Sequence, residues 1–306
     1  MCPGQGAQKV GMGADVAERF PEARAVFDAV DEALGIALST LMWEGPQDQL
    51  TLTHNAQPAI LTHSLAAHAV VVDSLAPVAG AGHSLGEYSA YAAAGALDAA
   101  AAARLVRKRG ELMLEAGEHR QGTMAVIVGL ETPVIDKVCR DASDEAAVVV
   151  VANINAPGQV VISGDPVAVA RAGELLKTAG AKRVLPLNVS GAFHSPLMET
   201  AQVGLRAALE QVALAPPRFP VISNASAEAV SNSDDAKQLL GDQLTSPVRW
   251  VESMTRARAI TDSGTPFVEI GPGNVLSGLL RRIDRSATSV ALGTADQISD
   301  FLEQNA

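Results

Sequence analysis

A serine between two glycines is the sharpest chemical signal in the sequence. The segment Gly82–Gly86 (G-H-S-L-G) follows a short run of small residues and precedes an alanine-rich stretch. A strand, this turn and a helix together form a nucleophile elbow, in which glycines allow the tight turn and the serine Oγ is exposed. Backbone N–H groups and the dipole at the helix N-terminus favour a developing oxyanion. The pattern predicts that Ser84 is a nucleophile, the alternative being an ordinary glycine-rich turn.

His194 is the histidine best placed to act as the general base that a serine nucleophile needs. It lies in the segment Gly191–Ser195 (G-A-F-H-S), at the second hinge of an inserted unit, where a cleft between two parts of the chain would open. Its position alone leaves a structural loop histidine as the alternative. We assign no chemistry to the remaining histidines, which lie on or near an apolar helix, in a polar connection, or beside Ser84: His54, His63, His68, His119 and His83.

Alternating helices and strands must position these residues. Before the inserted unit, apolar spacing predicts four helices and one strand: 14–34, 57–74 with Pro58 in its first turn, 85–94, a helix capped by Asp98 that runs to Glu115, and a strand over 77–82. After the inserted unit, it predicts four further helices and two strands: 195–212, 234–244, 248–260 and 274–282, with strands over 219–223 and 266–270. This alternation is typical of an α/β core with a mostly parallel sheet.

The inserted unit, residues 122–190, has a different order, β-α-β-β-α-β. Its expected strands are 123–129, 147–152, 159–163 and 183–187, and its expected helices begin at Thr132-Pro133, with Thr132 as N-cap, and at Asp165-Pro166. This order is that of the ferredoxin-like split unit. We therefore expect an α/β fold with an α/β-hydrolase-like core made of residues 1–121 and 191–306, interrupted by a ferredoxin-like subdomain over 122–190.

Composition narrows the class of protein. The chain has 306 residues, of which 48% are hydrophobic and only 3% aromatic, and its net charge is -11. An acidic chain with few aromatic residues lacks the basic face and stacking platforms of a general nucleic-acid binder. Two cysteines, Cys2 and Cys139, cannot form a disulfide framework, and no apolar run reaches the roughly 18 residues of a membrane span. We expect a cytoplasmic protein, monomeric, with neither nucleic acid nor membrane as a partner.

Six short motifs in one order cover essentially the whole chain. Besides G-H-S-L-G-E and G-A-F-H-S, they are P-G-Q-G-A-Q at Pro3–Gln8, R-G at Arg109-Gly110, Q-L-T-S-P-V-R-W at Gln243–Trp250 and E-I-G-P-G at Glu269–Gly273. Together they resemble the malonyl-CoA:acyl carrier protein transacylases and the acyltransferase domains of fatty-acid and polyketide synthases. A set of six ordered motifs is far more specific than a single elbow.

The resemblance implies a role for each matching residue. Ser84 would take the malonyl group from coenzyme A as an ester, and His194 would be its base and then the acid for the departing thiol. Gln243 would orient His194 through its backbone carbonyl, and the backbone N–H groups of Gln5 and Leu85 would form the oxyanion hole. The acceptor would be the phosphopantetheine thiol of an acyl carrier protein in fatty-acid biosynthesis, with no metal or redox cofactor.

The resemblance also implies two residues that select the acyl group. Arg109 would bind the free carboxylate of the malonyl group, a task that suits a planar cation with two parallel donors. Without the resemblance, Arg107–Arg109 would be a solvated basic helix face. Phe193 precedes His194, and A-F-H at this place accompanies malonyl rather than methylmalonyl in related synthase domains. A buried packing ring is the alternative for Phe193.

Three other activities fit parts of the pattern. A serine thioesterase or esterase uses the same elbow but has no need for a carboxylate-binding arginine. A trans-acting polyketide acyltransferase would share every motif. A non-catalytic module that binds carrier protein would not need Ser84, His194 and Gln243 together. Two groups of basic residues are the candidates for docking an acidic carrier protein: Lys182 with Arg183, and Arg281 with Arg282 and Arg285.

The start of the chain departs from the family pattern. Only Met1 and Cys2 precede the P-G-Q-G turn, where the family has a hydrophobic strand. We expect either a start further upstream or a sheet that lacks most of one strand, with Gln5 less firmly held.

Overall fold

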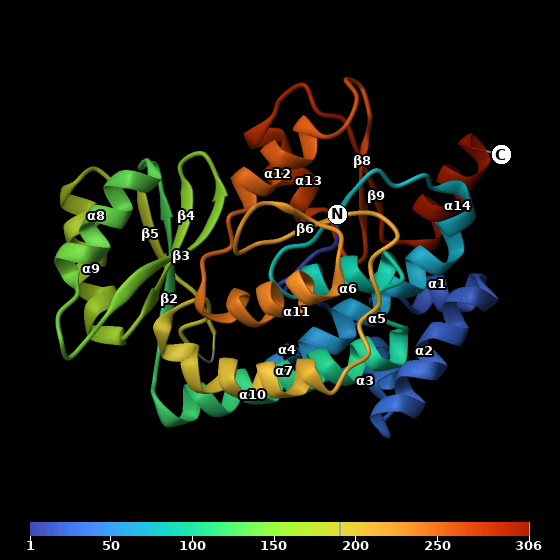
Figure 1. The fold of residues 1–306 in the computed structure, drawn as a ribbon, viewed down its shortest axis with the longest axis horizontal. Helices are drawn as coiled ribbons and strands as arrows, with labels where there is room; N and C mark the ends of the chain where they lie inside the picture. Colours follow the sequence, from blue (N-terminus) through green and yellow to red (C-terminus); the bar gives the residue numbers. More distant parts are fainter. Residues whose placement is uncertain (190, 306) are drawn as a thin grey trace.

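The computed structural model describes residues 1–189 and 191–305, and it is an α/β structure. Ser190 and Ala306, the last residues of the expected subdomain and core, lie outside the described residues. A small sheet with two helices stands at one side, and a larger part contains both ends of the chain (Figure 1). In the described part of the chain, no helix combines the length and apolarity needed to cross a membrane.

The N-terminal region is a layer of helices around one buried helix. These helices are α1 (Ala14–Arg19), α2 (Pro21–Leu34), α3 (Leu38–Glu44), α4 (Gln47–Thr51) and α5 (Thr53–Val71), which continues into the 3-10 turn η1 (Val72–Ser74). The single helix expected over 14–34 is two, because Phe20 precedes a proline and is extended. The start expected at Gln57 is also wrong. Helix α5 begins at Thr53, so Pro58 lies inside it.

Short strands hold the larger part together. Strand β1 (Gly80–Ala81) pairs in parallel with β6 (Val221–Ile222), which pairs antiparallel with β7 (Ala229–Val230). Strands β8 (Phe267–Ile270) and β9 (Ser289–Leu292) form a separate parallel pair. The strands expected over 77–82 and 219–223 are thus much shorter, and the sequence patterns did not predict β7 or β9.

Met1 and Cys2 connect these two sheets. The N–H of Cys2 donates to Ala81 O (2.9 Å), and Cys2 O accepts from the N–H of His83 (3.1 Å). On the other side, the N–H of Ile270 donates to Met1 O (2.9 Å), and the terminal ammonium of Met1 donates to Val268 O (2.5 Å). The two residues therefore lie as a short strand between β1 and β8, and they place the following P-G-Q-G turn against the elbow.

Helices surround these strands. They are α6 (Leu85–Ala93), α7 (Ala99–His119), α10 (Glu199–Glu210), α11 (Ser233–Asp242), α12 (Trp250–Ala259), α13 (Val275–Ile283) and α14 (Ala295–Gln304), with 3-10 turns η2 (Pro196–Met198) and η3 (Gln243–Thr245). Asp98 caps α7 as predicted, accepting from the N–H of Ala101 at 2.7 Å. The helix expected over 195–212 begins as η2 and becomes α10 only at Glu199. The C-terminal α14 was not predicted.

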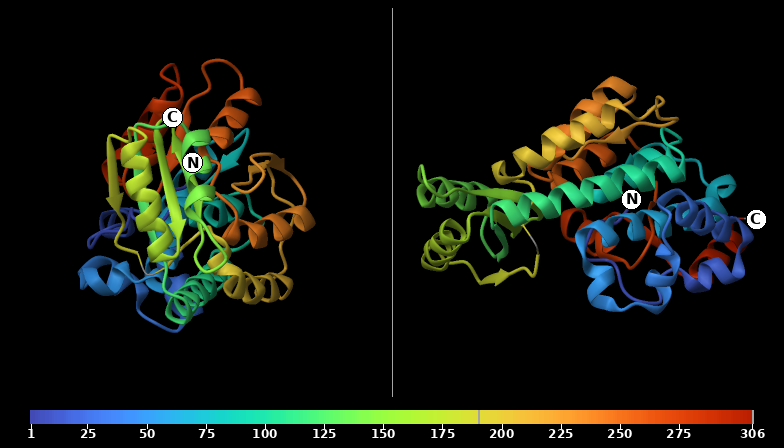
Figure 2. Two further views of the ribbon diagram at one scale, coloured as in Figure 1. Left: turned by 90° about the vertical axis from the view of Figure 1, so that its left-hand side faces the viewer. Right: turned by 90° about the horizontal axis from the view of Figure 1, so that it is seen from below.

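The small sheet contains β2 (Thr123–Val128), β3 (Val149–Ala156), β4 (Gln159–Gly164) and β5 (Arg183–Pro186), with α8 (Thr132–Ala142) and α9 (Pro166–Thr178) in the predicted chain order. Its strands are antiparallel in the order β3-β4-β2-β5. Helices α8 and α9 lie on the side away from the larger part, and α7 extends from that part towards the sheet (Figures 1 and 2). The N-cap of α8 is Glu131, one residue before the expected Thr132.

Candidate active site

Ser84 occupies a strained turn between β1 and α6. Its φ of 51° and ψ of -109° lie outside the regions that L-residues normally occupy. A Cβ atom on Gly82 would lie 1.9 Å from the backbone of Gly86, and one on Gly86 would lie 2.0 Å from Cys2 O. Both positions therefore require glycine because backbone segments meet there. The turn leaves the serine hydroxyl in contact with residues from two other parts of the chain, His194 and Arg109.

Asn224 fastens this turn, and the sequence patterns did not predict it. Its side-chain Oδ1 accepts from the N–H of Ser84 (2.7 Å), and its Nδ2 donates to Gly82 O (2.7 Å). Asn224 is fully buried and lies two residues after the end of β6, which pairs with β1. One side chain thus bridges the backbone on both sides of His83, which helps a strained conformation to persist.

His194 has the geometry of a general base for Ser84. Its Nε2 lies 2.8 Å from Ser84 Oγ, and its Nδ1 lies 2.9 Å from the main-chain oxygen of Gln243. A carbonyl oxygen can only accept a hydrogen bond, so Nδ1 carries the proton and Nε2 accepts from the serine hydroxyl. Burial, and next the charge of Arg109, lower the pKa of His194 to about 3. The imidazole is therefore neutral at pH 7, as a base must be.

Arg109 turns inward from α7 and meets the same hydroxyl. Its Nη1 donates to Gln57 Oε1 (2.8 Å), and its Nη2 donates to Gln243 Oε1 (2.9 Å) and to Ser84 Oγ (3.2 Å). Only 1% of the residue is exposed, whereas the adjacent Lys108 faces solvent. The guanidinium also lies over the ring of Tyr88, 5.3 Å from its centre. The solvated basic face is therefore excluded for Arg109.

The segments of Gln5 and Leu85 are neighbours. Leu85 is the first residue of α6, at the helix end where backbone N–H groups have no acceptor within the helix. Gly4 packs so closely on the elbow that a Cβ atom there would lie 2.4 Å from His83 O. The side chain of Gln5 donates to Thr53 Oγ1 at 3.3 Å. The turn of Gln5 thus lies beside Ser84, although only Met1 and Cys2 precede it.

Phe193 lies next to the base but packs inward. It is 6% exposed and belongs to the main buried hydrophobic cluster, together with Met198. A Cβ atom on Gly191 would lie 3.2 Å from its ring. The packing role that the sequence left open is therefore present in the structure.

Two further polar side chains join the site without having been predicted. Glu87 is fully buried, and its Oε2 accepts from Gln243 Nε2 (2.6 Å) and from the N–H of Asn224 (3.0 Å). Gln57 is also fully buried, and it holds Arg109. The motif G-H-S-L-G-E contains Glu87 one helical turn after Ser84, which is the signal that could have found it. Gln57 lies inside a helix that is buried along most of its length, and its sequence gives no such signal.

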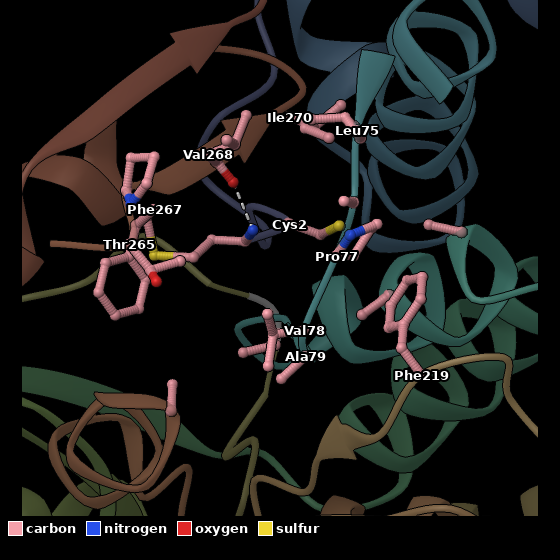
Figure 3. A pocket seen from close by; sticks show the side chains of 18 of the residues that line it. Cys2, Leu75, Pro77, Val78, Ala79, Phe219, Thr265, Phe267, Val268 and Ile270 are labelled. Carbon is pink, nitrogen blue, oxygen red and sulfur yellow. Dashed lines mark hydrogen bonds between the residues drawn. The ribbon is translucent and has the colours of Figure 1, made fainter. Parts of the chain in front are cut away.

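A separate cavity of about 300 Å³ lies beside Met1 and Cys2, between β1 and β8 (Figure 3). Its walls are mainly apolar and include Val78, Phe219 and Phe267. Neither Ser84, His194 nor Arg109 lines it. This cavity is therefore not the site that the serine, histidine and arginine form.

Comparison with known proteins agrees with this geometry. Residues 1–299 match the family described as acyl transferase domain. The chain is 46% identical to a malonyl CoA-acyl carrier protein transacylase of Bacillus subtilis over 299 residues, which are 97% of this chain and 94% of that one. It is 42% identical to the protein of the same description in Escherichia coli K12 over 303 residues, 98% of this chain and 97% of that one.

Solved structures give the same result. An acyl-carrier-protein-S-malonyltransferase from Bartonella henselae superposes with a TM-score of 0.93 at 40% identity, covering 99% of this chain and 98% of that one. A malonyl-transacylase solved in complex with its type II PKS acyl-carrier protein gives a TM-score of 0.92 at 41% identity, covering 99% and 97%. The chain therefore belongs to the acyl transferase family and, within it, to the malonyl CoA-acyl carrier protein transacylases.

Proposed function

We propose that this protein transfers a malonyl group from malonyl-CoA to the phosphopantetheine thiol of an acyl carrier protein, through a malonyl ester on Ser84, in fatty-acid biosynthesis. The observation that carries the proposal is the convergence on one hydroxyl: His194 Nε2 and Arg109 Nη2 both contact Ser84 Oγ. The first contact serves acyl transfer in general. The second brings a buried cation to the place where a malonyl carboxylate would lie.

In the first half-reaction, Ser84 Oγ attacks the thioester carbonyl carbon while His194 Nε2 takes the hydroxyl proton. The N–H groups of Gln5 and Leu85 donate to the resulting oxyanion. The C–S bond then breaks, and His194 returns the proton to the coenzyme A sulfur, leaving the malonyl ester. In the second half-reaction, the carrier-protein thiol gives its proton to His194 and attacks the ester, and Ser84 recovers its proton.

Arg109 selects the acyl group by its charge. The malonyl carboxylate lies one methylene beyond the reacting carbonyl, within the same small space as Ser84 Oγ. In the described part of the chain, the buried Nε of Arg109 has no hydrogen-bond partner. A carboxylate would supply acceptors for a guanidinium whose donors are not all used. A serine thioesterase or esterase for neutral esters has no use for this group, which favours transfer of malonyl.

The carrier protein would dock on a basic patch formed by two groups of residues: Lys182 with Arg183, and Arg281 with Arg282 and Arg285. Arg282 donates to the side chain of Gln159, which lies opposite Val128 in the small sheet, and Val128 lies opposite Arg183 on its other side. Lys182 and Arg183 are exposed, as is Arg282. Asn155, near this end of the sheet, bonds to His83 beside the nucleophile (2.8 Å). An acidic partner bound at the patch would thus be near Ser84.

We also propose how the chain is divided. Residues 1–121 and 191–306 would form an α/β-hydrolase-like core, and residues 122–190 a ferredoxin-like subdomain, on the basis of the β-α-β-β-α-β order and the sheet order β3-β4-β2-β5. The reaction needs no metal or redox cofactor, and we take a cytoplasmic monomer as the acting unit. A polyketide carrier protein is the alternative acceptor, because a related transacylase is solved with one.

Intact mass tests the proposal directly. Incubation with malonyl-CoA should add one malonyl group to the protein, and addition of phosphopantetheinylated carrier protein should remove it and acylate the carrier. Ser84→Ala should abolish the adduct, because no other hydroxyl contacts His194 Nε2 among the described residues. An adduct that persists in Ser84→Ala would contradict the assignment. Loss of the adduct to water at the same rate with and without carrier would favour a hydrolase.

A further inference from the structure

One buried carboxylate contacts both of the residues that hold the site in place. Glu87 lies in α6, one turn after Ser84, and none of it is exposed. A single oxygen, Oε2, accepts from Gln243 Nε2 at 2.6 Å and from the N–H of Asn224 at 3.0 Å. Gln243 carries the oxygen that orients His194, and Asn224 fastens the turn of the nucleophile. Glu87 touches neither the hydroxyl nor the imidazole, so any effect on the reaction passes through these two neighbours.

The contacts of Gln243 allow its amide group only one orientation. Its Oε1 faces Arg109, which can only donate, and its Nε2 faces Glu87 and the main-chain oxygen of Ser84 (3.0 Å). A reversed amide would place its donors against the guanidinium and its oxygen against two acceptors. Of the two acceptors of Nε2, only Glu87 can carry a charge, and hydrogen bonds to a charged group are the strong ones. Removal of its oxygen leaves the main chain of Ser84 as the remaining acceptor for Nε2.

The hydrogen bond between Gln243 and Glu87 connects onward to Arg109, the residue proposed to select the acyl group. Arg109 donates to Gln243, and Gln243 donates to Glu87, so a cation, an amide and a carboxylate form one chain of hydrogen bonds. The hydrogen bonds within such a chain polarise and strengthen one another in a buried site. Burial raises the pKa of Glu87 to about 7, while the bonds from Gln243 and Asn224 and the charge of Arg109 oppose that rise. Ionising the buried Glu87 carboxyl therefore costs free energy. The carboxyl lies at the end of this chain of hydrogen bonds, where it can order Gln243 and Arg109.

We propose that Glu87 is a positioning residue for malonyl selectivity, whose carboxylate oxygen fixes the amide of Gln243 and through it the guanidinium of Arg109. The proposal rests on the function proposed above. It has a consequence that a merely structural role would not have. Loss of the Glu87 oxygen should slow transfer of malonyl, whose carboxylate uses Arg109, more than transfer of acetyl, which has no carboxylate. Damage to the fold or to the elbow alone would slow both acyl groups alike.

The test uses Glu87→Met, which keeps the length of the side chain but supplies no strong acceptor, and Glu87→Gln, which keeps one oxygen. Single-turnover acylation of Ser84 is followed by intact mass with malonyl-CoA and with acetyl-CoA. Glu87→Met should lower the malonyl rate about 10- to 100-fold and the malonyl-to-acetyl ratio about tenfold. Glu87→Gln should keep that ratio within about threefold of the unmodified protein, because its oxygen can still accept from Gln243.

A double-mutant cycle identifies the route. Gln243→Ala removes the side chain but keeps the main-chain oxygen that binds His194. In that background, Glu87→Met should change the malonyl-to-acetyl ratio less than about threefold, because the intermediary is already absent. Equal losses for both acyl groups in Glu87→Met, or an undiminished change of the ratio in the Gln243→Ala background, would overturn the proposal.

Glu269 supplies the matched control. It is another fully buried carboxylate, and it accepts from the N–H groups of Leu276 (2.9 Å) and Ser277 (2.7 Å) at the start of α13. Glu269→Met should lower thermal stability and leave the malonyl-to-acetyl ratio unchanged. If the unmodified protein does not acylate Ser84 with malonyl-CoA, the proposed function fails. If it does and Glu87→Met keeps the same ratio, only the role of Glu87 fails.

Discussion

Two halves of the site meet at Ser84 Oγ, and they are built differently. The transfer half consists of Ser84, His194 and the main-chain oxygen of Gln243. The recognition half consists of Arg109 and the side chains of Gln57 and Gln243. The first half contains a main-chain contact and, in the proposed reaction, would act on any acyl group. The second half depends on side chain to side chain contacts and concerns only an acyl group with a free carboxylate.

Because the two halves use different atoms, the rate of acyl transfer and the choice of acyl group can be changed separately. Gln243 belongs to both halves, but through different atoms: its main-chain oxygen contacts His194, and its side chain contacts Arg109. Substitutions in the recognition half should therefore change which acyl group is transferred before they change whether transfer occurs. Substitutions at Arg109, at the basic patch and at Phe193 test that separation, from the largest expected effect to the smallest.

The largest effect should come from Arg109→Ala. Loss of a buried guanidinium that pairs with a carboxylate should lower kcat/KM for malonyl-CoA about 100- to 1000-fold, equivalent to about 3–4 kcal/mol. Acetyl transfer should fall less than about tenfold, since acetyl has no carboxylate. Steady-state transfer to carrier protein with each acyl-CoA measures both values. Arg107→Ala, two positions earlier in α7, is the control and should leave the ratio unchanged. Equal losses for both acyl groups would show that the halves are not separable.

A smaller effect should follow charge reversal on the basic patch. Lys182→Glu with Arg183→Glu, or Arg282→Glu alone, should raise KM for carrier protein about 3- to 10-fold, because rim charges mainly assist encounter. KM for malonyl-CoA should stay the same, and the difference should shrink at high salt. Arg24→Glu on α2 changes net charge elsewhere and should have no such effect. A patch variant that behaves like Arg24→Glu would place the docking surface somewhere else.

The smallest effect should be that of Phe193→Ser. A smaller residue beside His194 should raise methylmalonyl transfer relative to malonyl at most about fivefold, the lower end of the about 1–3 kcal/mol that one methyl group accounts for. The variant should also lose thermal stability, because the ring is buried. Phe193→Leu keeps an apolar side chain and separates the two effects. Competition between malonyl-CoA and methylmalonyl-CoA gives the ratio directly, and an unchanged ratio would leave packing as the role of Phe193.

The sequence predicted the small sheet better than the larger part. In the small sheet, β-branched strands and helices that start at proline follow simple periods, and each of the strands from β2 to β5 was expected. In the larger part, β1 and β6 have two residues each, and packing rather than propensity decides their length. Helix α5 is buried around most of its circumference, so no polar face and no clear period marked its start.

In the site, short motifs predicted some residues and missed others. Ser84 and His194 could be found because both lie in glycine-containing segments, and in the structure both have an unusual backbone conformation with positive φ, 51° and 57°. Arg109 needed the family resemblance, since three basic residues in a row do not reveal which one is buried. Asn224 and Gln57 are positioned by contacts between distant segments, which a single sequence does not encode in any short pattern. Glu87 stood within a recognised motif, but only the fold shows what it contacts.

The partner of His194 is an atom that every amino acid carries. Because Nδ1 bonds to the main-chain oxygen of residue 243, no amino-acid substitution at that position deletes the acceptor atom. Only displacement of the backbone around η3, as by an insertion or deletion, would remove it. Substitution of residue 243 therefore keeps the acceptor that orients His194, while it changes the side-chain contacts to Arg109 and Glu87. Inherited variation at residue 243 should thus diversify substrates and leave the reaction itself intact.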